Sequence, residues 1–414
     1  MELEKYCRAG DLIALRDYCD RAGVTAAQVR ASHALQIACR GGHLEVARWL
    51  QQTFQLTAAD ARSEHNSALY TSCSNGHREV VRWLQQTFQL TAADARDENN
   101  FALRWACERG HLEVACWLQQ TFQLTAADVR ADDNYALRWA CSNGHLEVAR
   151  WLQQTFQLTA ADARSQDNSA LRWACSNGHL EVARWLQQTV RLTAADARTQ
   201  SNYALRWACS NGHLEVARWL QQTFQLTAAD ARTDNNEALR WACSNGHLEI
   251  ARWLQQTFRL TAADARAQNN CALRSACLNG DLEVARWLQQ KFELIATDVW
   301  PGDNWVLYWA CSNGHLEMAR WLQRTWGIPP DVLATTGCDP KFVACAAYLQ
   351  HLRALRWSPR THADFPLPVR RLALLLLLIN QRLARELGEP GALPYLPPEI
   401  WLHLLSYLPT HTPA

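Results

Sequence analysis

The chain has 414 residues, of which 48% are hydrophobic, and this content predicts a large folded body rather than a disordered chain. It carries 41 basic and 40 acidic residues, so its formal net charge of +1 gives no reason to expect nucleic acid or an anionic membrane as a partner. The first residues read as an amphipathic helix without the apolar core of a signal peptide. The longest apolar run, Leu372 to Ile379, is far shorter than the ~20 residues that cross a bilayer. We therefore expect an intracellular protein, cytoplasmic or nuclear, whose fifteen cysteines are reduced thiols.

A 34-residue period runs through most of the chain. A degenerate unit around Gly10 precedes the array, and another that keeps Ala344 and Cys345 in register follows it. Such repetition predicts a stack in which each unit packs only on its neighbours, and end units diverge because one side of each faces water. The glycine that breaks each unit recurs at Gly42, Gly76, Gly110, Gly144, Gly178, Gly212, Gly246, Gly280 and Gly314.

The first half of each unit predicts a helix that ends at a glycine. In the unit that begins at Asn134, this asparagine is the predicted N-cap of a helix with the sequence "YALRWACS". Leu137, Ala140 and Cys141 fall on one face of that helix. Gly144 then ends it, because glycine adopts the left-handed conformation of helix ends without a steric penalty.

The second half of the unit predicts another helix, "HLEVARWLQQTF". Leu146, Ala149 and Leu152 form its apolar ridge, and we expect Leu146 to face the core together with the cysteine of the first helix. The sequence "LTAADAR" follows. Thr159 and Asp162 have the spacing of a capping box, which predicts a short third helical turn.

The segment "SALRWACSNGHLEVARWL", from Ser169 to Leu186, resembles the ankyrin-repeat pattern T-P-L-H-x-A-A-x-x-G-H-x-x-V-V-x-x-L-L. The resemblance extends in register over about Met1 to Trp357. It implies an all-α fold, an α-solenoid of stacked helix-turn-helix repeats with a C-terminal helical cap. It also implies a non-enzymatic, monomeric module that binds proteins and needs no cofactor or metal. Tetratricopeptide repeats share the period but lack the Asn-Gly-His break and fit less well.

The chain departs from the ankyrin pattern in three places. Arginine replaces the histidine of T-P-L-H, tryptophan stands at the first leucine of the last pair, and "QQTFQLTAADAR" replaces the usual Gly-Ala of the finger. We therefore expect a helical or irregular finger in place of a β-hairpin.

Each unit repeats side chains that could in principle carry chemistry. Cys141 and His145 are four residues apart, but a zinc site needs about four ligands and each unit offers two across a helix break. A disulfide ladder is disfavoured because stacked helices lie ~8–10 Å apart and disulfides need Cα separations under ~7 Å. An acid–base pair of His145 with Glu147 would recur equally in every unit, which does not suit an enzyme. Buried cysteine, and a histidine that ties the turn by hydrogen bonds, are the favoured interpretations.

The tryptophans of each unit, such as Trp139 and Trp151, allow two interpretations. They could form a platform for carbohydrate or bases, but aromatic residues at fixed helical spacing are more often packing residues. We therefore expect them to pack within and between units.

One position varies while its surroundings are nearly constant. This position directly follows the asparagine that recurs in register in the repeats. In related ankyrin proteins, partners bind along the edge of the array on which this position lies. Drift of exposed loops explains polar exchanges there, but it explains the aromatic residues less well. We expect a partner-binding surface, called here the variable stripe, at Ser67, Phe101, Tyr135, Ser169, Tyr203, Glu237, Cys271 and Trp305.

The tail after Trp357 does not repeat. Prolines define a linker over 358–368, and residues 369–414 contain an apolar helix, a Gly/Pro break and a final helix "LPPEIWLHLLSYLP". The final helix resembles the first helix of an F-box, and the two helices together resemble a SOCS box. F-box-like tails of this kind occur in ankyrin proteins of large DNA viruses. The residues that match the F-box are Leu396, Pro397, Glu399, Ile400, Leu404, Leu405 and Leu408.

The two tail resemblances imply recruitment of a cullin–RING ubiquitin ligase. The chain would then be a substrate adaptor, with a protein partner of unknown identity bound to the repeats. The alternative is a plain ankyrin scaffold whose tail only caps the last repeat.

Overall fold

The computed structural model describes residues 2–295, 298 and 305–326, and within these residues every regular element is a helix. The predicted final unit, the linker and the tail residues Leu396 to Leu408 lie outside the described residues. The chain divides into two compact units, Met1–Asp230 and Ala231–Ala414.

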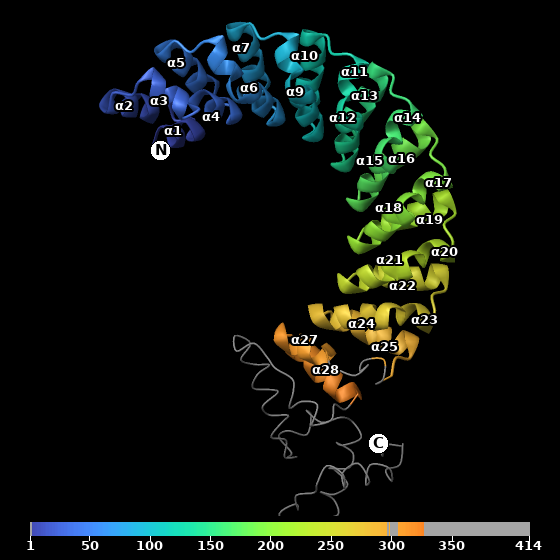
Figure 1. The fold of residues 1–414 in the computed structure, drawn as a ribbon. Helices are drawn as coiled ribbons and strands as arrows, with labels where there is room; N and C mark the ends of the chain where they lie inside the picture. Colours follow the sequence, from blue (N-terminus) through green and yellow to red (C-terminus); the bar gives the residue numbers. More distant parts are fainter. Residues whose placement is uncertain (1, 296–297, 299–304, 327–414) are drawn as a thin grey trace, which may run out of the picture. The chain divides into compact units, whose positions relative to one another are not determined.

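Each repeat consists of a first helix, a turn, a second helix and a short finger helix that follows the second helix (Figure 1). The first helices are α1 (Glu2–Ala9), α4 (Ala34–Arg40), α6 (Ala58–Ser74), α9 (Asp97–Glu108), α12 (Ala131–Ser142), α15 (Ser165–Ser176), α18 (Thr199–Ser210), α21 (Thr233–Ser244), α24 (Ala267–Asn279) and α27 (Trp305–Ser312). The second helices are α2 (Leu12–Ala22), α5 (Leu44–Phe54), α7 (Arg78–Phe88), α10 (Leu112–Phe122), α13 (Leu146–Phe156), α16 (Leu180–Val190), α19 (Leu214–Phe224), α22 (Leu248–Phe258), α25 (Leu282–Phe292) and α28 (Leu316–Trp326). The finger helices are α3 (Ala26–Ala31), α8 (Ala92–Ala95), α11 (Ala126–Val129), α14 (Ala160–Ala163), α17 (Ala194–Ala197), α20 (Ala228–Ala231) and α23 (Ala262–Ala265), and the first part of α6 is the finger helix that follows α5.

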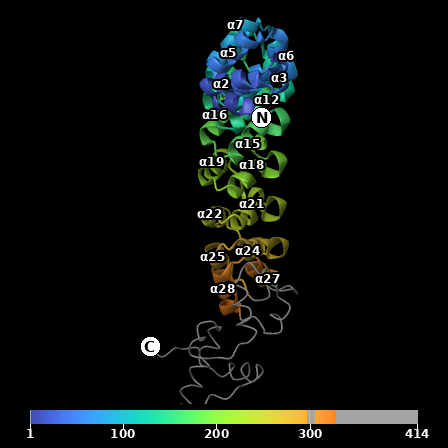
Figure 2. The ribbon, with the colours of Figure 1, turned by 90° about the vertical axis from the view of Figure 1, so that its left-hand side faces the viewer.

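Within each unit, the first helices form one layer and the second helices form the other. Figure 2 shows the two layers as parallel columns, for example α15 and α18 beside α16 and α19. The core lies between them. In the repeat of α12, the predicted face of Leu137, Ala140 and Cys141 is at most 2% exposed.

The second helix buries the predicted ridge except at its first residue, Leu146. In α13, Val148, Ala149 and Leu152 are at most 2% exposed, whereas Leu146 is only half-buried. The reason is positional: Leu146 is the first residue of the helix, at the rim of the turn, and Val148 is the residue that points between the layers.

The predicted capping box is confirmed. The backbone N–H of Thr159 donates to Asp162 Oδ2 at 2.7 Å, and the Thr159 hydroxyl donates to the same oxygen at 2.9 Å. The finger is therefore helical, as expected, and begins at a Thr-Asp cap.

The prediction that Asn134 is an N-cap is wrong. Asp132, Asp133 and Asn134 all have left-handed backbone, with φ of 53°, 53° and 62°, and the Asn134 N–H donates to the Arg130 carbonyl at 3.2 Å. The chain thus passes from the finger into the first helix through a left-handed turn rather than from an extended residue. Left-handed backbone disfavours bulky side chains, and asparagine and aspartate tolerate it best, which accounts for the polar residues at these positions.

A side chain of the neighbouring repeat packs against the glycine turns. Gly144 has a φ of 80°, and a Cβ atom there would lie 2.5 Å from Nδ1 of His179, in the next repeat. The turn glycines with φ between 76° and 88° include Gly76, Gly110, Gly144, Gly178, Gly212, Gly246 and Gly314.

The turn histidines His43, His77, His111, His145 and His179 bond to the previous repeat rather than within their own turns. His77 Nε2 lies 3.0 Å from the carbonyl oxygen of Arg40, and His43 Nε2 lies 3.0 Å from that of Arg8. Histidine and glycine are therefore two parts of one contact between repeats.

Candidate functional site

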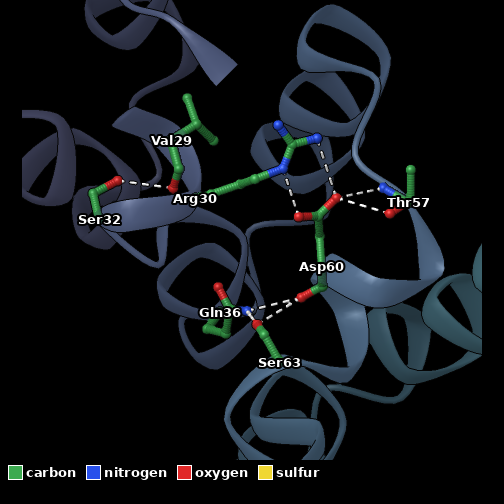
Figure 3. Close-up of polar contacts among 7 residues, drawn as sticks. All are labelled: Val29, Arg30, Ser32, Gln36, Thr57, Asp60 and Ser63. Atoms are coloured by element: carbon green, nitrogen blue, oxygen red, sulfur yellow. Dashed lines mark hydrogen bonds and ion pairs between the residues drawn. The ribbon is translucent and has the colours of Figure 1, made fainter. Parts of the chain in front are cut away.

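An arginine–aspartate ladder joins successive finger helices. Figure 3 shows its first rung: Arg30 Nε donates to Asp60 Oδ1 at 2.7 Å, and Nη2 donates to Oδ2 at 3.4 Å. The N–H and hydroxyl of Thr57 donate to the same carboxylate, so one aspartate caps its own helix and binds the preceding repeat. The rungs of this Arg–Asp ladder are Arg30–Asp60, Arg62–Asp94, Arg96–Asp128, Arg130–Asp162, Arg164–Asp196, Arg198–Asp230, Arg232–Asp264 and Arg266–Asp298.

The ladder was not predicted from the sequence, although a signal was present. The aspartate and the arginine recur together in the fingers from Asp60–Arg62 to Asp264–Arg266, and the arginine precedes the aspartate of the next unit by 32 residues in every rung after Arg30–Asp60. It fixes the finger that precedes each first helix, and it thereby positions the first-helix face.

Most of the first helices, from α9 to α24, carry a second recurrent arginine, and in α12 and α15 it binds the left-handed turn. Arg138 Nε donates to the Asp133 carbonyl at 2.8 Å, and its Nη2 donates to the Asp132 carbonyl at 2.9 Å. Arg172 makes the same two bonds to Asp167 and Gln166, at 2.7 and 2.9 Å. Arginine at the histidine position of T-P-L-H therefore satisfies carbonyls that the left-handed turn leaves unpaired.

The variable stripe lies on the first helices, each residue four positions before the tryptophan position of the same helix. This spacing brings the two side chains together. The Phe101 and Trp105 ring centroids are 6.3 Å apart, and those of Tyr203 and Trp207 are 5.5 Å apart. In the same way, Trp241 Nε1 donates to Glu237 Oε1 at 2.9 Å.

The stripe residues also touch the preceding repeat. The guanidinium of Arg104 lies 4.1 Å from the centre of the Tyr135 ring, and that of Arg172 lies 4.9 Å from the centre of the Tyr203 ring. The Tyr135 hydroxyl donates to Glu108 at 2.6 Å, and burial together with this carboxylate raises the pKa of Tyr135 to about 12.

Exposure along the stripe is uneven. Phe101, Tyr135, Tyr203, Glu237 and Cys271 are half-buried, so each presents part of its side chain to solvent. Ser169, by contrast, is only 2% exposed and is not accessible to a partner. Trp305 begins α27, and its side chain lies outside the described residues.

The tryptophans of the first and second helices differ. Trp151 of the second helix packs edge-on against Phe156, with centroids 5.4 Å apart, as the packing interpretation predicts. In the first helices the half-buried Trp139 packs against Tyr135, with centroids 5.6 Å apart, and Trp173 packs against Tyr203 of the next repeat at 5.7 Å, as the packing interpretation predicts. Several first-helix tryptophans are nevertheless about two-fifths exposed. These are Trp173 (40%), Trp207 (39%), Trp241 (43%) and Trp309 (39%).

The repeated cysteines and histidines have separate environments. Cys141 is fully buried, and burial raises the pKa of its thiol well above the usual range, so it is a core side chain. His145 is half-buried; burial lowers its pKa, against the hydrogen bond to the Glu108 backbone, which raises it. The repeated Cys–His pair is therefore split between the core and the contact between turns.

One group in the described part of the chain has metal-ligand geometry, and it is not a repeated Cys–His pair. Ligand atoms of His65, Asp97 and Glu98 lie within 4.8 Å of one another. His65 Nδ1 is 3.1 Å from Glu98 Oε1, and the two side chains are 72% and 46% exposed, so the group forms a surface ion pair when the histidine is protonated.

No helix among the described residues has both the length and the apolar character needed to cross a membrane.

Comparison with known families gives one result. A family model described as ankyrin repeats (3 copies) matches residues 14–94, 35–133, 103–196, 187–264 and 205–298. No curated protein shows a significant match to the chain.

Proposed function

The chain belongs to the ankyrin-repeat family, whose members are protein-interaction scaffolds, and from this premise we propose that it binds a protein partner through the exposed face of its first helices. The observation that supports the proposal most is the set of first-helix tryptophans, with Trp173 and Trp207 about two-fifths exposed in neighbouring repeats of the same unit. Exposed tryptophan beside arginine is the composition of energetic centres in protein interfaces.

The variable stripe belongs to the same proposed surface. Phe101, Tyr135 and Tyr203 contact the tryptophan of their own helix, so a change at the stripe alters the surroundings of that tryptophan. This arrangement would let the partner's identity depend on the stripe while the tryptophans supply affinity. The proposed role is non-enzymatic, since the His–Glu pairs recur alike in unit after unit.

The experiment compares two variants that lack tryptophans at different places in the fold. Full-length protein, the double variant Trp173→Ala with Trp207→Ala, and the control Trp185→Ala are used for affinity purification with quantitative mass spectrometry. Trp185 is half-buried on α16, a second helix, and outside the proposed surface. The proposal expects partners to be lost from the double variant and kept by the control. Equal recovery from both variants, with the circular dichroism of both unchanged, would refute it.

We further propose that the tail recruits a cullin–RING ubiquitin ligase, which would place the protein in the cytoplasm or nucleus as a monomeric substrate adaptor. Its support is the F-box-like sequence at Leu396, Pro397, Glu399, Ile400, Leu404, Leu405 and Leu408, together with a repeat array that can hold a substrate. The test is co-purification of ligase subunits with the full chain and with Ile400→Asp plus Leu404→Asp. Loss of the subunits in the variant is expected. If deletion of residues 396–414 lowers the melting temperature yet changes no partner, the tail is a cap and the adaptor proposal fails.

A further inference from the structure

A histidine and two carboxylates from consecutive repeats meet at the left-handed turns. Ligand atoms of His65, Asp97 and Glu98 lie within 4.8 Å of one another, and His65 Nδ1 is 3.1 Å from Glu98 Oε1. His65 lies in the left-handed turn inside α6, with a φ of 53°, whereas Asp97 and Glu98 open α9. The group therefore spans the contact between two repeats.

The same two positions meet in other repeats, so their proximity is a property of the array. Gln166 Nε2 donates to Asp133 Oδ2 at 2.7 Å, and Gln200 Nε2 donates to Asp167 Oδ2 at 2.7 Å. In both pairs the residues are 33 apart in the sequence, as are the histidine and the glutamate of the group. What changes at the group is the chemistry: an imidazole faces a carboxylate, and both are metal ligands.

Asp97 adds a second carboxylate, and a buried side chain orients it. Asn66 Nδ2 donates to Asp97 Oδ2 at 2.8 Å, and the Glu98 N–H donates to Asp97 Oδ1 at 3.1 Å. Asn66 is only 7% exposed, so it holds the carboxylate as outer-shell partners hold metal ligands. The positions that correspond to Asp97 in other repeats carry no acidic residue; they hold Ser63, Ala131, Ser165, Thr199, Thr233 and Ala267.

The charge of the group favours a divalent cation. Its two carboxylates carry two negative charges, and a single imidazole offsets at most one of them. The arginines closest to the group in sequence, Arg62 and Arg96, each bind a ladder aspartate through Nε and Nη2. Arg104 of α9 binds Asp132 at 2.6 Å. These three arginines are thus engaged by other carboxylates, and a divalent cation would balance the charge of the group.

The ligand types and their spacing fit zinc. Zn²⁺ binds imidazole nitrogen and carboxylate oxygen at ~2.0–2.2 Å, so two ligand atoms of a tetrahedral site lie roughly 3.3–3.5 Å apart. The 3.1 Å between His65 Nδ1 and Glu98 Oε1 is close to this spacing. Their side chains are 72% and 46% exposed, so both can rotate to bring all three ligand atoms to one ion. Ca²⁺ and Mg²⁺ take oxygen ligands and make poor use of an imidazole.

We propose that His65, Asp97 and Glu98 bind a zinc ion, with a water molecule as the fourth ligand. The ion joins α6 to α9. It stabilises the folded chain, because the unfolded chain does not hold the three ligands together. The site is separate from the binding of a protein partner, so it stands or falls independently of the proposed function.

The first test is isothermal titration calorimetry of Zn²⁺ into the full chain, with variants taken from the array itself. His65→Asn and Glu98→Gln introduce the residues found at the corresponding positions Asn99 and Gln166, which have left-handed φ of 56° and 51°. The backbone therefore tolerates both changes. We expect each variant to bind one Zn²⁺ fewer than the native chain. An excess of Mg²⁺ should not displace the ion from the native chain.

A control distinguishes this site from Zn²⁺ binding elsewhere on the chain. Cys116→Arg removes a half-buried thiol outside the group, and the corresponding positions in neighbouring repeats hold Arg82 and Arg150. This variant should bind as many Zn²⁺ ions as the native chain. Zn²⁺ should also raise the urea midpoint of the native chain and of the control, but not that of His65→Asn.

The second test builds the group in another repeat. The triple variant Asp133→His, Ser165→Asp and Gln166→Glu places the same three residues at corresponding positions, where Asp133 and Gln166 already meet. It should bind one Zn²⁺ more than the native chain. Equal numbers of bound Zn²⁺ in the native chain and the two loss variants, displacement by Mg²⁺, or no additional ion in the triple variant would each overturn the inference.

Discussion

Arg130 and Asp162, which lie 32 residues apart, are joined by two hydrogen bonds, from Nε to Oδ1 at 2.7 Å and from Nη2 to Oδ2 at 3.1 Å. The same carboxylate accepts two hydrogen bonds from Thr159, so it serves the helix cap and the contact between repeats at once. These hydrogen bonds, of which those from Arg130 have the largest effect, lower the pKa of Asp162 to about 2.

Replacing this carboxylate should cost more than replacing a surface charge. We expect Asp162→Asn to lower the free energy of unfolding by ~2 kcal/mol, because the aspartate is buried and capped while its arginine is partly exposed and screened. Urea unfolding followed by circular dichroism measures this. The control is Glu147→Gln, whose ion pair with Arg150 is exposed at 3.6 Å and should change the stability by less than ~0.5 kcal/mol. Equal losses would show that the ladder contributes no more than a surface pair.

The acid dependence of stability follows from the ladder. The pKa of Asp162 is lower in the folded chain than its ordinary value of 3.8, so the unfolded chain binds protons more readily. The stabilisation is thus present above about pH 4 and is lost as the pH falls towards 2. Urea midpoints measured between pH 5 and pH 2 should fall steeply, and the fall should be smaller in Asp162→Asn. An unchanged slope in the variant would contradict the assignment.

The turn histidines predict a separate loss at milder pH. Burial lowers the pKa of His77, His111, His145 and His179, so the folded chain favours their neutral form. Their contribution is present above the ordinary histidine pKa of ~6.5 and is lost as the pH falls through the lowered values. His145→Gln should reduce the difference in urea midpoint between pH 7.5 and pH 5. A larger difference in the variant would argue against buried, neutral histidines.

Gly144 should resist substitution for two reasons. Its φ of 80° is unfavourable for other residues, and an added Cβ would lie 2.5 Å from the His179 ring. We expect Gly144→Ala to destabilise the protein by ~2 kcal/mol or more, and His179→Ala to be less harmful in that background than in the native one. Additive effects in this double-mutant cycle, read from urea unfolding, would show that the ring does not contact the glycine.

Gln157 offers the opposite case. It ends α13 with a left-handed φ of 52°, a conformation that glycine adopts without penalty. Gln157→Gly should raise the free energy of unfolding by ~0.5–1 kcal/mol, whereas Gln153→Gly, inside the same helix, should lower it by ~1 kcal/mol. A loss of stability in both variants would contradict the left-handed end.

The sequence predicted what depends on local spacing. The two helices, the break at Gly144 and the Thr159–Asp162 cap each follow from residues a few positions apart, and the period follows from recurrence every 34 residues. The Arg130–Asp162 bond joins different repeats, and no local propensity indicates it. The left-handed turn at Asp132–Asn134 was mistaken for an N-cap because asparagine suits both.

The candidate site was predicted in part for the same reason. The variable stripe was predicted because its composition changes within a nearly constant background, and its binding role remains a proposal. The first-helix tryptophan lies four residues after each stripe residue. We interpreted it as a packing residue because core residues recur with the same regularity. The two roles are separated only by where the side chain lies in the fold. Trp173 is 40% exposed, whereas Trp151 is half-buried against Phe156.

The most direct test of the account is the affinity of one identified partner for three forms of the full chain. Its dissociation constant is measured by calorimetry for the native protein, for Trp173→Ala with Trp207→Ala, and for Trp185→Ala. The account predicts at least a tenfold weaker complex for the double variant, about 1.4 kcal/mol, and an unchanged one for the control. Equal affinity for the native protein and the double variant would contradict the claim that the first-helix face is the binding surface.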